Sequence, residues 1–134
     1  MTSFTAIAQN WESSYDDALA NAAKTEKSLL IVFAGSDWCA PCIKLDREIW
    51  SSEDFIAYAK ENYVLYRADF PRKKKNELAA EVATANRQLA DKFNPDGYFP
   101  LVILLDSEER VLGKTSYKKV TPKEYISHLN AFLK

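Results

Sequence analysis

Glycine and proline are scarce in this 134-residue chain, which has three glycines and five prolines. That content excludes collagen-like, fibrous and low-complexity proteins, which contain far more of both residues. Charge of either sign is not in excess, since 18 Lys and Arg stand against 19 Asp and Glu, for a formal net charge of -1. Nucleic-acid and anionic-membrane binders need a net basic face, so the charge balance argues against both classes.

Long apolar runs and an export signal are also missing from the sequence. The longest apolar run extends from Leu29 to Ala34, far short of the roughly 20 residues that a membrane-spanning helix needs. Residues 1–10 have neither the basic start nor the apolar stretch of a signal peptide. We therefore expect no membrane insertion, and the visible sequence by itself indicates a cytoplasmic protein.

Apolar residues are plentiful, at 47% of the chain, and aromatic residues make up 13%. This content excludes a disordered chain, which would lack the apolar surface to offset the entropy lost on ordering. The length fits a single domain, residues 1–134, that buries its core without disulfides or metals as scaffolding.

Helical and extended apolar patterns alternate along the chain. Helical spacing and capping residues predict helices within the segments 14–27, 39–50, 52–59, 78–93 and 121–133. Short apolar runs predict strands at 29–34, 63–70, 101–105 and 111–114, and Trp11 is a candidate for a short first strand. This alternation predicts an α/β domain in which helices cover both faces of a central mixed β-sheet. In the last helix we expect the core to receive Tyr125, Leu129, Phe132 and Leu133.

Both cysteines of the chain stand in one Cys-x-x-Cys motif, Cys39 to Cys42, where an apolar strand meets a helix. The free N–H groups and the dipole of a first helical turn stabilise an anion, which favours a thiolate at Cys39. We predict that Cys39 is the nucleophile and that Cys42 closes a disulfide with it or resolves a mixed disulfide. Ala40 and Pro41 form the spacer, and proline is tolerated in a first helical turn because its missing N–H costs little there.

Three other interpretations of the cysteine pair compete with the redox one. Structural zinc needs four ligands, and the chain offers only the two sulfurs and the distant His128. A c-type haem attachment needs a histidine after the second cysteine, where this chain has Ile43. An inert pair of buried thiols is the third alternative. The spacing at a strand-to-helix turn favours the redox pair, so no metal and no small-molecule cofactor are assigned.

The chain resembles thioredoxin-fold proteins over about residues 11–133. The resemblance rests on Trp38-Cys39-Ala40-Pro41-Cys42 after the apolar strand and on Phe99-Pro100 before the later one. The stretches Gly35-Ser36-Asp37-Trp38-Cys39 and Asp69-Phe70-Pro71 are similar to a bacterial subgroup. Members of that subgroup are thioredoxin-like disulfide reductases and isomerases, typically exported to the cell envelope.

The resemblance implies that Pro100 is a cis proline beside the sulfurs, where it exposes the backbone of Phe99 for pairing with a substrate segment. From the sequence alone, a trans proline at the start of a strand would be the expectation. The resemblance also implies that Trp38 and Phe99 form an apolar docking surface, and a core position is the alternative for Trp38. The predicted substrate-binding residues are therefore Trp38, Phe99 and Pro100.

The sequence departs from cytosolic thioredoxins at the positions of a buried acid and its partner lysine. The matching positions are apolar here and correspond to Val32 or Phe33 and to Leu65. The sequence therefore leaves three candidates for the proton acceptor of Cys42, namely Asp37, Glu48 and water. The Ala-Pro dipeptide also differs from the usual Gly-Pro, and the residues between the sulfurs help to set their potential.

These features predict a thiol–disulfide oxidoreductase that reduces protein disulfides through the Cys39-Ala40-Pro41-Cys42 dithiol and a mixed-disulfide intermediate. The expected partners are disulfide-containing protein substrates and an electron-donor redox protein, and the expected oligomeric state is a monomer. A disulfide isomerase or oxidase is one alternative, and a non-catalytic binding module that holds partners through Trp38 and Phe99 is another. The resemblance favours the periplasm if a signal peptide has been removed, and the cytoplasm otherwise.

Two further polar features have ordinary explanations in the sequence. Residues 72–75, Arg-Lys-Lys-Lys, predict a solvated connection rather than a nucleic-acid or lipid site. His128, the single histidine of the chain, is expected to be structural or exposed because it lies in the last predicted helix, away from the cysteines.

Overall fold

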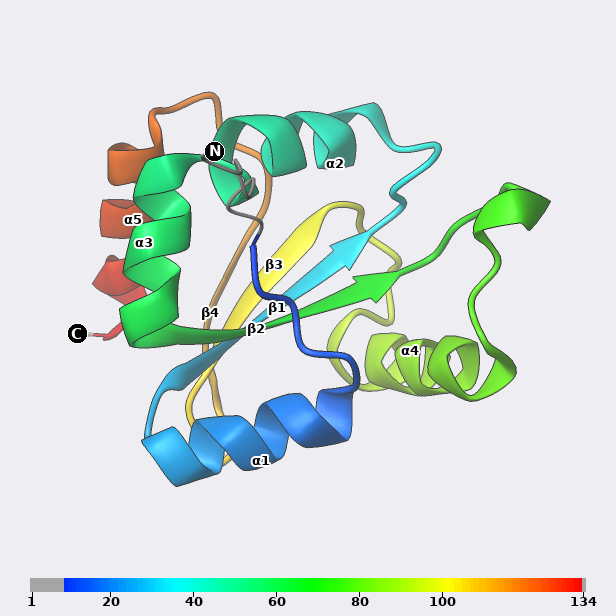
Figure 1. The fold of residues 1–134 in the computed structure, drawn as a ribbon, viewed down its shortest axis with the longest axis horizontal. Coiled ribbons are helices and arrows are strands. Elements are labelled where there is room, and N and C mark those ends of the chain that lie inside the picture. Colours follow the sequence, from blue (N-terminus) through cyan, green and yellow to red (C-terminus); the bar gives the residue numbers. More distant parts are fainter. Residues whose placement is uncertain (1–8, 134) are drawn as a thin grey trace, which may run out of the picture.

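A mixed sheet forms the centre of the computed structural model, which describes residues 9–133 (Figure 1). The strands are β1 Ser28–Ala34, β2 Tyr63–Asp69, β3 Leu101–Leu105 and β4 Val111–Thr115. They lie in the order β2-β1-β3-β4. β1 and β2 are parallel, whereas β3 is antiparallel to both β1 and β4. The mixed sheet predicted from the sequence is therefore confirmed.

Helices connect and cover the strands. Their bounds are α1 Tyr15–Thr25, α2 Ala40–Leu45, α3 Glu53–Asn62, α4 Ala80–Phe93 and α5 Pro122–Asn130. Side-chain oxygens at the caps explain where several of them begin, since Ser14, Ser52 and Thr121 each accept a hydrogen bond from the backbone of the first turn. Short helical segments add η1 Asp46–Trp50, η2 Lys74–Asn76 and η3 Ala131–Leu133.

The core consists of two layers, one on each face of the sheet. α2, α3 and α5 pack on the face that receives Leu30 and Val32 of β1. α1 and α4 pack on the opposite face, against Leu29, Ile31 and Phe33 of the same strand (Figure 1). β1 is therefore buried on both sides, and each of its large apolar side chains contributes roughly 1.5–3 kcal/mol of burial. Helices on both faces confirm the predicted α/β thioredoxin architecture.

The structure corrects the sequence-based element bounds in a few places. The helix predicted within 78–93 begins at Ala80, so Leu78 precedes α4 and is not helical. Leu133 is 51% exposed and does not face the core. Trp11 forms an isolated parallel bridge with Leu65, which confirms a short extended segment ahead of α1. No helix within residues 9–133 is long and apolar enough to cross a membrane.

Candidate active site

The two cysteines lie at the junction of β1 and α2 and form the Cys39–Cys42 disulfide, with Cα atoms 5.2 Å apart. Cys39 is the N-cap of α2, and its Sγ accepts a hydrogen bond from the backbone N–H of Cys42 at 3.3 Å. Both residues are only 5% exposed. Exposure therefore does not distinguish the two sulfurs, whereas the cap position does, because only Cys39 Sγ faces the N–H groups of the first turn.

The Phe99–Pro100 peptide bond is cis, as the family resemblance implied. Pro100 is buried, and it lines a small cavity together with Cys42. The rings of Trp38 and Phe99 meet edge to face with their centroids 5.4 Å apart. Both rings are half-buried, so Trp38 is not a plain core residue. The fold thus brings the aromatic residues predicted for substrate binding together near the motif.

The loop before the motif is fastened to the segment that follows β2. The Asp37 carboxylate accepts hydrogen bonds from the backbone N–H groups of Arg72 and Lys73 and from the Asn76 side chain, at 2.9–3.0 Å. The indole N–H of Trp38 donates to the carbonyl oxygen of Phe70 at 2.7 Å. Residues 72–75 are exposed, as the sequence suggested, but their backbone is anchored to the redox loop and is not merely solvated.

These contacts give Asp37 an unusually acidic carboxyl group. The hydrogen bond from the Arg72 backbone and that from the Asn76 side chain lower the pKa of Asp37 to about 2, from 3.8. Asp37 therefore stays ionised through neutral pH and holds three donors in place. A carboxylate engaged in this way is poorly suited to take a proton from Cys42, which removes one of the acceptors considered from the sequence.

The lowered pKa of Asp37 predicts a pH-dependent contribution to stability. Because its folded pKa lies below its unfolded value, the stabilisation is complete above about pH 4 and is lost as pH falls toward 2. We expect Asp37→Asn to lower the urea midpoint at pH 5, and the difference from the unmodified protein to shrink by pH 2. Asp96→Asn, at an exposed turn residue, should follow the unmodified protein, and a difference that is constant with pH would contradict the prediction.

Glu48, another proton acceptor considered from the sequence for Cys42, is hydrogen-bonded to a different residue. Its carboxylate accepts a hydrogen bond from the Tyr117 hydroxyl at 2.7 Å, and this bond raises the pKa of Tyr117. His128 bonds the Thr115 hydroxyl at 2.7 Å and packs against Phe132, so it is structural, as expected. Burial lowers the pKa of His128.

Sequence reasoning missed a polar pair behind the second cysteine. A cavity of about 100 Å³ is lined by Cys42, Val32, Asp46 and Arg67, among others. Asp46 lies one helical turn after Cys42, and its carboxylate is 3.5 Å from the Arg67 guanidinium on β2. The spacing of four residues could have indicated Asp46, since such positions share a helix face. The cavity also shows that Val32, rather than Phe33, faces the cysteine, because Phe33 packs on the opposite face.

Comparisons with known proteins agree with this site. Residues 10–107 match the family model described as Thioredoxin-like. The disulfide bond reductase DsbH of Chlamydia pneumoniae is 31% identical over 124 residues, which cover 92% of this chain and 72% of the relative. The thioredoxin-related protein DsbJ of the same organism is 32% identical over 100 residues, covering 75% of this chain but 28% of that protein. The solved structure of the DsbH oxidoreductase superimposes with a TM-score of 0.86 at 27% identity, covering 99% of this chain and 91% of that one.

The chain belongs to the thioredoxin-like family. The family match and the Cys39–Cys42 disulfide confirm the class predicted from the sequence, a thioredoxin-like thiol–disulfide oxidoreductase. Within residues 9–133, no three His, Cys, Asp or Glu side chains cluster in a way that could hold a metal ion.

Proposed function

We propose that this protein reduces disulfide bonds in polypeptide substrates through the Cys39–Cys42 pair. The observation that carries the proposal is the placement of Cys39 Sγ at the N-cap of α2, with Cys42 within bonding reach. The first-turn N–H groups and the helix dipole stabilise a thiolate there when the pair is reduced. The similarity to a protein named disulfide bond reductase supports the reductive direction.

The proposed reaction has two exchange steps. The Cys39 thiolate attacks one sulfur of the substrate disulfide, so that a Cys39–substrate bond forms and the other substrate sulfur leaves as a thiolate. The Cys42 thiolate then attacks Cys39 Sγ, which closes the Cys39–Cys42 disulfide and releases the second substrate thiolate. The substrate gains two electrons, and the dithiol loses them.

Cys42 must lose its proton before the second step. We assign the acceptor to Asp46, because its carboxylate lines the same cavity as Cys42 and lies one helical turn away. A cavity of about 100 Å³ holds one or more waters by volume, so the proton can pass through a bridging molecule. The guanidinium of Arg67 on β2 lies 3.5 Å from that carboxylate and holds it at the cavity.

Trp38, Phe99 and Pro100 form the proposed substrate surface. Phe99 lies directly before Pro100, and an extended substrate segment would pair with its backbone as a short added strand. The half-buried rings of Trp38 and Phe99 supply an apolar contact next to the disulfide. Ala40 and Pro41 serve as the spacer between the two sulfurs.

The direction of the reaction is tested by the reduction potential of the pair. Equilibration of the protein with a dithiothreitol or glutathione series gives this potential directly. We expect a reduction potential of about −250 mV or lower, close to the roughly −270 mV of reducing thioredoxins. A value of about −180 to −120 mV would instead indicate an isomerase or oxidase and would overturn the reductive assignment.

The proposed partners follow from the chemistry. The oxidised pair must be reduced again, so an electron-donor redox protein is required, and no small-molecule cofactor takes part in the two exchange steps. We propose a monomer that acts on disulfide-containing proteins in the cell envelope. The envelope location rests on the resemblance to exported bacterial members of the family.

A further inference from the structure

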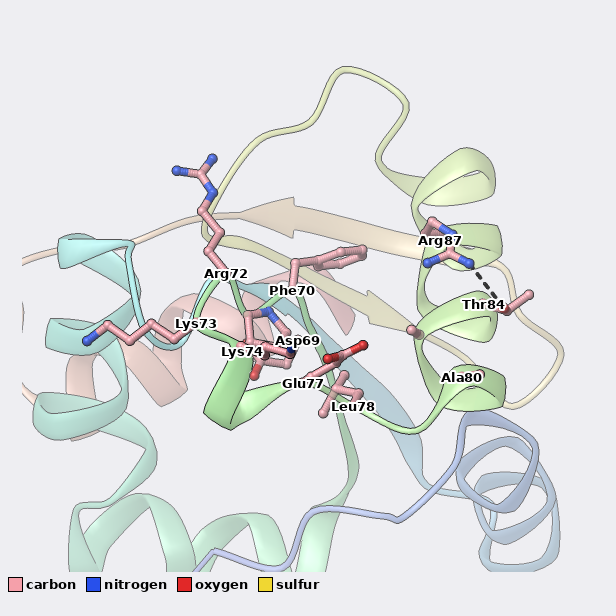
Figure 2. Close-up of a pocket in the computed structure, with 12 residues that line it drawn as sticks. Asp69, Phe70, Arg72, Lys73, Lys74, Glu77, Leu78, Ala80, Thr84 and Arg87 are labelled. Atoms are coloured by element: carbon pink, nitrogen blue, oxygen red, sulfur yellow. Dashed lines mark hydrogen bonds between the residues drawn. The ribbon is translucent and has the colours of Figure 1, made fainter.

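A groove of about 650 Å³ lies between the segment that follows β2 and the first turns of α4 (Figure 2). Residues 69–74, together with Glu77 and Leu78, form one wall. The other wall is the face of α4 that carries Ala80, Thr84 and Arg87, and the Arg87 guanidinium donates to the Thr84 hydroxyl at 3.1 Å. The proposed redox chemistry uses none of the side chains on the α4 wall.

The groove carries positive charge in a chain whose formal net charge is -1. Its cationic lining residues are Arg72, Lys73, Lys74 and Arg87, and its carboxylates are Asp69 and Glu77. None of these cations is in an ion pair within residues 9–133. Asp69 already has partners, because its carboxylate accepts hydrogen bonds from the Ser36 backbone N–H at 2.9 Å and from the Ser36 hydroxyl at 2.5 Å. All four cationic residues are exposed. Arg72 lies over the Trp38 ring, and the Lys73 side chain projects away from α4 in Figure 2, so Lys74 and Arg87 are the cations that a ligand in the groove would meet.

The groove is continuous with the face that carries the aromatic pair. A second hollow, lined by Trp38 and Phe99, shares Phe70, Pro71 and Arg72 with it. The Arg72 guanidinium lies over the Trp38 ring at 3.8 Å from its centroid. The hydrogen bonds of Asp37 and Trp38 to residues 70–76 hold the cationic wall at a fixed position relative to the motif.

We propose that this groove binds an acidic segment of the polypeptide substrate. That segment neighbours the substrate cysteine that forms the mixed disulfide with Cys39, so this inference rests on the proposed function. A substrate that crosses the Trp38–Phe99 face continues past Arg72 into the groove. Glu and Asp side chains in that stretch then meet Lys74 and Arg87. Complementary charges of this kind act on encounter rate and on the choice of partner.

The lining favours a peptide over a nucleic acid. Single-stranded nucleic acids are held by aromatic platforms on which bases stack. Phe70, the aromatic residue among the described lining residues, packs edge to face against Phe99 with centroids 5.4 Å apart. Leu78, Ala80 and Ala83 add small apolar contacts of the kind that suit the stem of an acidic side chain.

The test uses two synthetic peptides that share one intramolecular disulfide and differ in the flanking tail. One tail contains Asp and Glu, and the other contains Asn and Gln at the same positions. For the full-length protein we expect kcat/KM to be about fivefold higher for the acidic peptide, as two exposed charge contacts would give. High salt should abolish the preference by screening.

Lys74→Gln combined with Arg87→Gln is the informative variant, since both side chains are exposed and neither is ion-paired with any residue that the structure describes. We expect it to lose the preference while reducing the neutral peptide at the unmodified rate. Lys24→Gln combined with Lys123→Gln removes the same charge from exposed positions on α1 and α5 and is the matched control. The control should keep the preference, and circular dichroism should show that both variants are folded.

Several outcomes would overturn the groove proposal. These are equal rates of the unmodified protein on the two peptides, an equal loss of preference in both double variants, and tighter binding of an oligonucleotide or of phosphatidylglycerol vesicles than of the acidic tail. Fluorescence anisotropy with the reduced and alkylated acidic peptide separates the two proposals. Suppose that the protein reduces the disulfide of neither peptide, but the alkylated acidic peptide binds and the Lys74→Gln, Arg87→Gln variant loses that binding. The proposed function is then wrong, whereas the groove proposal is supported.

Discussion

Cys42→Ser is expected to convert a turning-over reductase into a covalent trap. Serine cannot attack the Cys39–substrate disulfide, so the mixed disulfide persists after the first exchange step. Turnover should fall by more than roughly 1,000-fold, as for other losses of an essential nucleophile. A disulfide-linked adduct should appear on a non-reducing gel and disappear with dithiothreitol. Mass spectrometry should place the substrate on Cys39.

Cys39→Ser is the matched control for the trapping experiment. It removes the sulfur at the N-cap and leaves Cys42, whose backbone N–H lies within the first turn. We expect no turnover and no adduct from this variant. Trapping through Cys42 instead would reverse the roles assigned to the two sulfurs. Retention of partners after replacement of both cysteines would indicate a binding module rather than an enzyme.

Trp50→Ala is expected to cause the largest loss of stability among single core substitutions considered for this fold. Trp50 is 1% exposed and meets the rings of Trp11, Phe55 and Tyr125 edge to face, with centroids 4.8–6.3 Å apart. Truncation removes these contacts and enlarges the cavity that Trp50 lines together with Cys42. We expect the free energy of unfolding to fall by roughly 3–5 kcal/mol, measured by urea denaturation.

Tyr98→Ala provides the control for the core substitution. Tyr98 is 64% exposed, and the hydrogen bonds of this residue with Asn94 involve only its backbone atoms. Its removal should change the free energy of unfolding by less than about 0.5 kcal/mol. A comparable loss in the two variants would contradict the packing described around Trp50.

The fold and the cysteine pair could be predicted because each rests on a local signal. The apolar run 29–34 indicates a strand buried on both faces, and the caps at Ser14, Ser52 and Thr121 indicate helix starts. The Cys-x-x-Cys spacing alone indicates a redox-active cysteine pair. The cis bond before Pro100 was available only through resemblance to a family, since sequence alone favours trans.

The surroundings of the cysteines could not be predicted, because they depend on contacts between distant segments. Asp37 meets donors 35 to 39 residues away, and nothing near it in the sequence indicates them. The orientation of Val32 was open because a strand buried on both faces has no alternation of polar and apolar residues. Asp46 begins η1 and Arg67 lies on β2, so their pairing depends on how the helix packs against the sheet and cannot be predicted from either segment alone.

Cys39 and Cys42 are each only 5% exposed, and under the proposed function this burial limits which substrate disulfides can reach them. We expect flat or recessed substrate disulfides to react poorly, because exchange needs a substrate sulfur to come into line with Cys39. If the proposed function holds, a disulfide on a mobile loop or an unfolded segment should therefore be reduced faster than the same bond recessed in a folded protein.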